Sequence, residues 1–252
     1  TSIQIKLNES RIAMNELFKW VPVLKKKINA SAFYNQSLRI NTLITGTLEK
    51  INIPILQLTG LDGSAINARA TLYHVTNAKK MMLDITLLSS NISKRDIAKF
   101  VKLSPAAFAQ LPAMLHLKAT AVGSLNQMQT EIYLVGTQLL LDAKASLKNL
   151  NNMKLFTYDV NIRKSHFQKN LLLSFIPKEK IPTSIELPQD IILSGTLKGD
   201  ANNILTNLKL DGSYGVATIK GYVNHFTNKE KASYDLHMTT QTFKIGKLLK
   251  KD

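Results

Sequence analysis

Cysteine is absent from the 252 residues, and aromatic side chains make up only 7% of them. Without cysteine the chain can hold no disulfide, no thiolate metal site and no cysteine nucleophile. A lack of cysteine is also consistent with an oxidising compartment such as a bacterial periplasm. Long apolar runs are missing too, so we expect neither a membrane-spanning helix nor a signal peptide in this sequence. The sequence starts at Thr1 instead of a methionine, and we expect it to be a piece of a longer protein.

Acidic residues are few, because 17 Asp and Glu stand against 33 Lys and Arg and leave a formal net charge of +16. A basic excess of this size favours anionic partners such as nucleic acid, phospholipid headgroups or acidic glycans. The alternative is that the lysines solvate the outer faces and edges of many strands. Their scattered distribution favours this alternative, and 25–27 is the only tight internal lysine cluster.

A long repeat is visible in the positions of three glycines: Gly60, Gly136 and Gly212 are each separated by 76 residues. Further pairs with the same spacing are Leu111 and Leu187, Gly123 and Gly199, Tyr158 and Tyr234, and Phe167 and Phe243. A long period repeated about three times is typical of an array in which one supersecondary unit stacks on copies of itself. Such arrays form elongated surfaces more readily than a single catalytic pocket.

The repeat predicts one continuous array with four parts. Residues 1–36 are expected to be the helical tail of a preceding repeat. Repeat units one and two are predicted at 37–110 and 111–186, and a truncated third unit is predicted at 187–252.

Strict alternation of apolar and polar residues predicts β-strands with one apolar face. In the second unit Leu139, Leu141 and Ala143 alternate with Asp142 and Lys144. The same alternation recurs over 115–123, 156–163, 208–212, 217–223 and 234–238. Short polar spacers at 149–152 and 224–229 indicate hairpins, so we expect neighbouring strands to be antiparallel.

Short helical signals follow the blocks of strands. Ile97, Phe100 and Val101 have the spacing of one helical face behind Ser93, which is a suitable N-cap residue. A second cap is predicted at 104–105, where serine precedes a proline at the first helical position. Weaker copies of the signal lie at 14–22, 171–177 and 243–249.

A sheet with one apolar face loses well over ten kcal/mol of burial, at about 25 cal/mol per Å², if that face stays in water. Three arrangements avoid this loss. The sheet can close into a barrel, pack against a second sheet, or curl into a trough that short helices cap and an apolar ligand lines. Alternation alone does not choose among them.

The segment 234–249, Tyr-Asp-Leu-His-Met-Thr-Thr-Gln-Thr-Phe-Lys-Ile-Gly-Lys-Leu-Leu, resembles a recurring element of the AsmA-like family, and within it of the TamB-type translocation and assembly proteins. In that family an alternating Tyr-Asp-Leu strand runs into a Phe-x-[Leu/Ile]-Gly-Lys-Leu-Leu helix start. The stretches 192–199 and 208–212 also resemble the family's strand-and-glycine pattern. The resemblance is weaker in the second unit, where Phe167 is followed by Gln-Lys instead of Ile-Gly, and weakest before Gly46.

The resemblance implies a mainly β fold with short helices, in which antiparallel units of about 76 residues curl into a half-pipe, or β-taco, with an apolar concave face. It further implies a location in the periplasm, an inner-membrane anchor outside this sequence, and a role in outer-membrane biogenesis through phospholipid binding or transport. The alternative role is a non-enzymatic scaffold or chaperone module for outer-membrane protein assembly, which recruits partner strands at free sheet edges.

The acyl chains of a phospholipid would lie along one set of apolar side chains. This predicted lipid groove consists of Leu115, Leu117, Leu139, Leu141, Phe156, Tyr158, Val160, Leu193, Leu210, Ile219, Leu236 and Met238. In an open trough, the odd-numbered set Leu139, Leu141, Ala143 and Ala145 and the even-numbered set Tyr234, Leu236 and Met238 must face the same concave side. Transport along such a groove is passive, so we expect no catalytic residue, metal or cofactor.

The residues that carry chemistry show no pattern that contradicts this expectation. None of the five histidines has a partner at metal-ligand spacing. Asp159 and Asp235 recur one repeat apart, which is too far for joint acid–base work. A glycan-active enzyme would need clustered carboxylates, and the sequence shows none. Nucleic-acid binding is disfavoured because Phe156, Tyr158 and Tyr234 share parity with aliphatic residues instead of lying in a basic groove.

Overall fold

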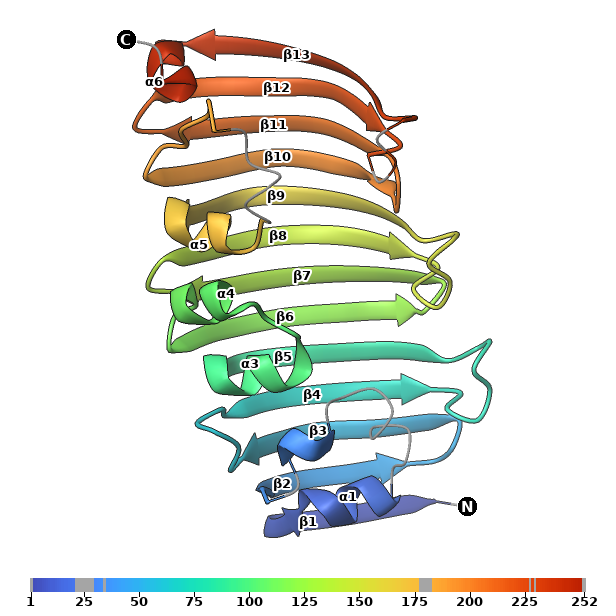
Figure 1. Cartoon of the computed structure of the whole chain (residues 1–252). Helices are drawn as coiled ribbons and strands as arrows, with labels where there is room; N and C mark the ends of the chain where they lie inside the picture. Colours follow the sequence, from blue (N-terminus) through green and yellow to red (C-terminus); the bar gives the residue numbers. More distant parts are fainter. Residues whose placement is uncertain are drawn as a thin grey trace. The chain divides into compact units, whose positions relative to one another are not determined.

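The structure of the chain is a computed structural model that describes residues 2–20, 30–33, 35–176, 183–226, 228 and 230–250. The described residues form thirteen strands, β1 to β13 in chain order, together with short helices (Figure 1). Within each of the two units given below, consecutive strands are neighbours in the sheet. Strand pairing is antiparallel, so the predicted fold class, mainly β with short helices, is confirmed. The chain divides into two compact units, Thr1–Ser124 and Leu125–Asp252.

The first unit, Thr1–Ser124, contains six strands and the helices that follow them. Its elements are β1 (Ile3–Ala13), α1 (Met14–Trp20), the 3-10 helix η1 (Ala30–Phe33), β2 (Ser37–Gly46), β3 (Lys50–Thr59), β4 (Ile66–Tyr73), β5 (Met82–Ser93), α3 (Lys94–Phe100), α4 (Pro105–Gln110) and β6 (Met114–Ser124).

The second unit, Leu125–Asp252, contains seven strands. Its elements are β7 (Gln127–Gly136), β8 (Leu139–Lys148), β9 (Thr157–Gln168), α5 (Lys169–Ser174), β10 (Asp190–Asp200), β11 (Ile204–Gly212), β12 (Gly215–Asn224), β13 (Ser233–Gln241) and α6 (Ile245–Leu249).

The elements recur in groups of four strands followed by helix. Residues 37–110 hold β2 to β5 with α3 and α4, residues 111–186 hold β6 to β9 with α5, and residues 187–252 hold β10 to β13 with α6. Residues 1–36 differ from the expected helical tail, because strand β1 precedes α1. The reason is visible in the chain: Ile3, Ile5 and Leu7 alternate with polar residues at the strand period.

The two predicted N-caps are confirmed. The side chain of Ser93 accepts a hydrogen bond from the backbone N–H of Asp96, and that of Ser104 accepts one from the N–H of Ala107. α3 ends at Phe100, so Val101 lies one residue beyond the helix instead of in it. Pro22, the lysines at 25–27 and Pro177, which belonged to the predicted helical and basic features, lie outside the described residues.

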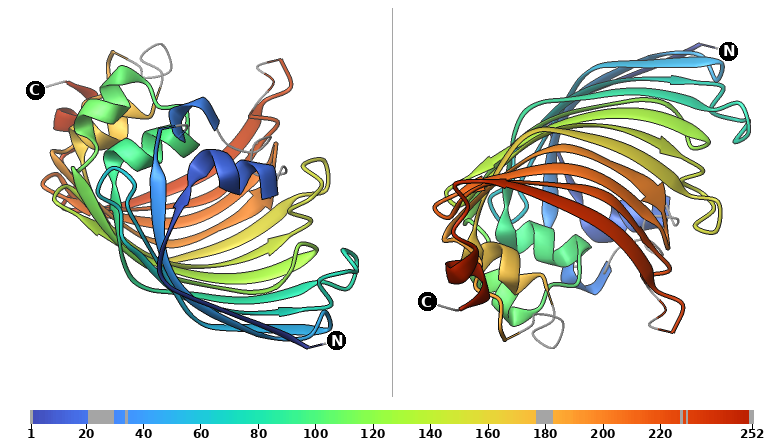
Figure 2. Two further views of the ribbon diagram at one scale, coloured as in Figure 1. Left: turned by 90° about the horizontal axis from the view of Figure 1, so that it is seen from below. Right: turned by 90° about the horizontal axis from the view of Figure 1, so that it is seen from above.

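In each unit the strands curve, and the helices α1, α3, α4 and α5 lie on the inner side of their unit's curve (Figure 2). We call this side of each sheet the inner face. In the first unit Met14 and Phe18 from α1 form a buried cluster with Phe33, Leu38 and Ile40. The core of this unit therefore lies between the inner face and the helices.

Three strands that run directly into a helix, β1, β5 and β9, depart from regular pairing. The register shifts between Leu7 and Ser10 in β1 and between Leu87 and Ser90 in β5, and β9 carries an extra residue between Ile162 and Ser165. Each shift is a β-bulge, which bends the strand and changes which residues face inward. Residues on both sides of each bulge therefore stay on the inner face although their parity changes.

A buried serine completes the bulges of β5 and β9. Ser90 and Ser165 are both 0% exposed. The hydroxyl of Ser90 accepts a hydrogen bond from the N–H of Asn67 at 3.0 Å and lies 3.2 Å from its carbonyl oxygen. The hydroxyl of Ser165 donates to the carbonyl of Leu193 at 3.0 Å. These hydroxyls bind backbone groups of the adjacent strand, which the bulge would otherwise leave unpaired.

Opposite the β9 bulge, Gly195 in β10 has a φ of +124°. A Cβ at this position would lie 2.1 Å from the carbonyl oxygen of Asn207 on β11. Only glycine fits there. Gly195 therefore belongs to a bent strand.

We predict that Ser90→Ala lowers the free energy of unfolding by about 1–3 kcal/mol, because the buried N–H of Asn67 loses its acceptor. Urea denaturation provides the measurement. Ser89→Ala is the matched control, since Ser89 is exposed and its backbone carbonyl, which binds the side chain of Asn67, is unchanged. Equal midpoints for the two variants would contradict the role of the hydroxyl.

Candidate functional site

One face of the second unit is apolar from strand to strand, as the pairing register shows. Directly paired residues in antiparallel strands point to the same side. Leu141 pairs with Ser165, which pairs with Leu193, which in turn pairs with Leu210. The same side continues through Ala217 of β12.

The two predicted sets of residues lie on this one face. Ala145 pairs with Val160, which pairs with Leu197, and the row continues through Thr206 and Gly221 to Leu236. A neighbouring row ends with Ile219 opposite Met238. The set that begins at Leu139 and the set that begins at Tyr234 are therefore joined by continuous pairing through β8 to β13. Burial identifies this as the inner face, because Ala143, Ser165 and Ile191 are buried on it.

The structure places eleven of the twelve predicted groove residues on strands that contribute to an inner face. Leu115 and Leu117 are on β6 of the first unit, and Leu139, Leu141, Tyr158, Val160, Leu193, Leu210, Ile219, Leu236 and Met238 are on β8 to β13 of the second. Phe156 is the exception, since it precedes β9 and packs its ring 6.0 Å from that of Tyr158. The exposed fraction of these eleven residues varies from 4% at Leu115 to 44% at Leu236.

The first unit has an inner face of the same kind. Ile44 lies on it in β2, Ile53 in β3 pairs with Ala70 in β4, and Ala70 pairs with Ile85 in β5. Ile85 pairs with Ala121 in β6. Apart from a few hydroxyl side chains, every position on this face is aliphatic or glycine.

The middle of each inner face is only half buried. The half-buried side chains include Ile44, Ile53 and Ile85 in the first unit. In the second unit they include Leu141 and Leu210. An aliphatic side chain in the core of a packed sandwich would instead be fully buried. In the described part of each unit, no second sheet covers these side chains.

The outer face carries the charges. Across β7, β8 and β9, Lys144 pairs with Glu131 at 2.7 Å, and Arg163 binds both Glu131 and Asp142. Hydrogen bonds from Lys144 and then Arg163 lower the pKa of Glu131. Lys198 pairs with Asp159 at 2.8 Å on the same side. Asp159 is therefore an outer-face residue held in an ion pair between neighbouring strands.

Tyr158 is the ionisable side chain among the predicted groove residues. Burial raises the pKa of its hydroxyl, and the nearby charge of Asp200 raises it further. The ring therefore stays neutral at physiological pH, which suits a position among aliphatic side chains.

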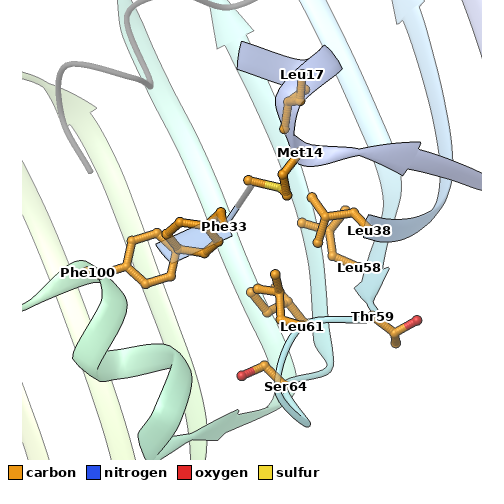
Figure 3. Close-up of a pocket in the computed structure, with 10 residues that line it drawn as sticks. Met14, Leu17, Phe33, Leu38, Leu58, Thr59, Leu61, Ser64 and Phe100 are labelled. Atoms are coloured by element: carbon orange, nitrogen blue, oxygen red, sulfur yellow. The ribbon is translucent and has the colours of Figure 1, made fainter. Parts of the chain in front are cut away.

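An apolar pocket of about 180 Å³ lies between the inner face of the first unit and its helices (Figure 3). The lining residues are Met14, Leu17, Phe33, Leu38, Leu58, Thr59, Leu61, Ser64, Ile66 and Phe100. The rings of Phe33 and Phe100 lie 5.2 Å apart and close one side, while Leu38 and Leu58 come from the sheet. None of these residues was among the twelve predicted for the lipid groove.

A buried carboxylate holds the loop beside this pocket. Asp96 on α3 is 1% exposed and accepts hydrogen bonds from the hydroxyls of Ser64 and Ser93 at 2.6 and 3.0 Å. It also accepts bonds from the backbone N–H groups of Asp62 and Ser64. The loop between β3 and β4 is thus fixed to the start of α3.

Lys99 joins the same cluster from the other side. Its ammonium lies 2.8 Å from Asp62, 2.9 Å from Asp96 and 2.8 Å from the side-chain oxygen of Gln36. It also lies 5.3 Å from the centre of the ring of Phe33. Because these partners occupy the ammonium, the charge next to the pocket is neutralised within the cluster.

The cluster sets the pKa of Asp96. Burial alone would raise it, but hydrogen bonds from Ser64, Lys99, the backbone of Asp62 and Ser93 outweigh burial and lower it. At the equivalent position after the N-cap of α5 the chain has Leu171, which is 2% exposed. Of α3 and α5, only α3 therefore carries the carboxylate cluster.

Sequence reasoning missed most of the first unit's inner face and the pocket. Ile51 and Ile53 have odd numbers, whereas Leu56 and Leu58 on the same face have even ones, because the register shifts between Ile53 and Leu56. The sequence does contain a signal for this register shift, which is Pro54, since proline in a strand often marks a bulge.

The described residues hold no group of three or more His, Asp or Glu side chains arranged to bind a metal ion. His116 on β6 is exposed, and its Nδ1 lies 2.5 Å from the side-chain oxygen of Asn91. Among the described helices, none has both the length and the apolar character needed to cross a bilayer.

We predict that Asp96→Asn lowers the free energy of unfolding by about 1–3 kcal/mol near neutral pH, because buried donors lose a charged acceptor. Because the pKa of Asp96 is lowered in the folded chain, the carboxyl group takes up its proton at a higher pH in the unfolded chain. The stability that the Asp96 carboxylate contributes is therefore lost as pH falls below about 4. Urea denaturation across this range should show a shallower pH dependence for Asp96→Asn than for the parent.

The matched control is Asp84→Asn, since Asp84 is exposed on β5. This variant should keep both the stability and the pH dependence of the parent chain. If Asp96→Asn retained the full pH dependence, the carboxylate would not be the group that links the loop to protonation.

No family model, no curated protein and no solved structure matches this chain.

Proposed function

We propose that this chain is a segment of a periplasmic AsmA/TamB-like protein whose inner faces bind acyl chains of phospholipids, as part of lipid transport between inner and outer membranes in outer-membrane biogenesis. One observation carries the proposal. In each unit the inner face is aliphatic from strand to strand, yet its middle is only half buried, whereas the outer face is charged and ion-paired.

Hydrocarbon is the ligand that this face accommodates best. Removing apolar surface from water stabilises a complex by about 25 cal/mol per Å². The carbonyls and N–H groups of the paired strands are already satisfied, so a ligand needs no hydrogen-bonding groups along the face. Curved strands wrap a flexible chain on more than one side, which increases the area buried.

Basic loops at one end of the strands provide contacts for an anionic headgroup. The loops after β4, β8 and β12 each begin with a left-handed residue, at His74, Asn149 and His225. In each loop an asparagine three residues later binds the N–H of the residue two positions on. The first two loops place Lys79 and Lys154 at that position. Attraction of headgroups to these lysines should weaken in salt.

The mechanism is passive. Acyl chains bind and leave through apolar contact, and nothing in the proposal requires bond making or breaking. The same apolar contacts between acyl chains and the inner faces would serve a lipid store, a binding groove and a conduit.

We predict that Leu236→Asp weakens the binding of a long-chain fatty acid to the second unit about tenfold, because a charge on the inner face removes contact with roughly two methylenes. Leu236 is 44% exposed, so the fold should tolerate the change. His237→Asp is the matched control, since the neighbouring side chain points to the outer face. A fluorescent fatty acid titrated into each purified variant measures the difference.

Equal affinities of Leu236→Asp and His237→Asp would remove the inner face at β13 from the binding site. Native mass spectrometry of the purified chain is the direct test for phospholipid. Consistent absence of phospholipid, together with no uptake of the fatty acid by the parent chain, would refute the proposed function.

A second candidate function is a scaffold that recruits partner strands. It is favoured by β13, whose nine residues are all exposed and which is paired with β12 along one edge. An exposed edge of this kind can take up a partner strand through backbone hydrogen bonds. Leu236→Asp should leave such pairing largely intact, so crosslinking to partners that survives this variant would favour the scaffold.

A further inference from the structure

The pocket beneath α1, η1 and α3 has the size and lining of a site for the end of a hydrocarbon chain. Its volume of about 180 Å³ is similar to that of an engineered apolar cavity of about 150 Å³ that stays dry and binds benzene. Leu38, Leu58 and Phe33 supply carbon surface on several sides.

The polar side chains of Ser64, which lines this pocket, and of Lys99 beside it already have partners. The hydroxyl of Ser64 donates to Asp96, and the ammonium of Lys99 binds Asp62, Asp96 and Gln36. A ligand in the pocket therefore gains little from polar groups, and a charged group would be left unpaired there. This arrangement selects the methyl end of a chain over its polar end.

The pocket is continuous with the inner face. Leu38 and Leu58, which line it, lie on β2 and β3, and the same face runs along β3 to Ile51 at the other end of the strand. That length of strand spans about 20 Å. One acyl chain in a bilayer leaflet spans about 15 Å, half of the hydrocarbon core. A single acyl chain laid parallel to the strands therefore fits on this face.

The opposite end of the same strands is basic. The loop between β2 and β3 and the loop between β4 and β5 are joined there by backbone hydrogen bonds from His74 to Glu49 and from Val75 to Leu48. Lys79 and Lys80 in the longer loop are exposed. They are suitable partners for a carboxylate or phosphate.

We propose that the first unit binds one acyl chain in a fixed orientation, with its methyl end in this pocket and its anionic end at Lys79 and Lys80. This inference rests on the proposed function and adds to it a direction and an end point. The ligand class is a single-chain or double-chain amphiphile with a carboxylate or phosphate head, and one chain occupies the pocket.

The orientation is tested on the full chain with two fatty acids, one carrying a nitroxide near its methyl end and the other near its carboxylate. NMR spectra of methyl-labelled protein report which side chains each nitroxide broadens. The methyl-end probe should broaden Met14 and Leu58, and the carboxylate-end probe should broaden Leu72 and Leu83. The reverse pattern, or broadening confined to the second unit, would overturn the orientation.

The pocket itself is tested by filling it. Leu58→Trp should abolish the uptake of benzene and weaken fatty-acid binding at the first unit about tenfold, whereas Ile55→Trp on the outer side of the same strand should change neither. Phe100→Ala, at a 53% exposed ring, provides a second variant that the fold should tolerate. It opens the pocket and should weaken benzene binding several-fold. Unchanged benzene binding in both variants would overturn the site.

The polar end is tested with the double variant Lys79→Gln and Lys80→Gln. About fivefold weaker binding per lysine is expected for a fatty acid, and no change is expected for the long-chain alcohol of the same length. A diacyl phospholipid with a phosphate head distinguishes a lipid headgroup from a free carboxylate. Fatty acid bound only by the second unit would overturn this inference and leave the proposed function standing, whereas no acyl binding by either unit would overturn both.

Discussion

The rest of the structure depends on one constraint, which is that every strand must keep its aliphatic residues on the side that the helices cover. Strict alternation of apolar and polar residues meets this constraint only within a regular stretch of strand. The bulges in β1, β3, β5 and β9 extend it over longer strands, because each one resets the parity at the point where the strand bends. Ser90 and Ser165 satisfy the backbone groups that these resets leave without partners. Continuous apolar faces, curved strands and half-buried aliphatic side chains all follow from this arrangement.

The polar chemistry of the molecule serves to position apolar surface. Asp96 and Lys99 bind each other and the loop at Asp62, and in doing so they hold the aromatic wall of the pocket in place. On the outer face, ion pairs such as Lys198 with Asp159 span neighbouring strands in contact with solvent, where each contributes little to stability. The charges therefore separate a side that contacts water from a side that is suited to hydrocarbon.

Much of the fold was predictable from local patterns. Alternation located the strands around Leu139 and Leu210, and the caps at Ser93 and Ser104 located two helices, because each signal lies within a few residues of the chain. The pocket was not predictable, since Met14, Leu58 and Phe100 meet only through tertiary packing. Leu56 and Leu58 were missed for a different reason: the bulge before them exchanges odd and even positions, which a fixed period cannot represent. Their function as ligand contacts stays a prediction.

The bulges also determine how the length of this chain is able to change in evolution. Adding or removing one residue inside a regular strand such as β8 would turn every later side chain of that strand to the opposite side. At a position such as the one between Leu87 and Ser90 an extra residue is already accommodated, so a bulge can appear or disappear there together with a compensating shift in spacing. The steps between corresponding landmarks vary by a residue or so in this chain: Ser90 and Ser165 are separated by 75 residues, whereas Gly136 and Gly212 are separated by 76. Repeats of this kind should therefore evolve a spacing that is nearly, but not strictly, regular.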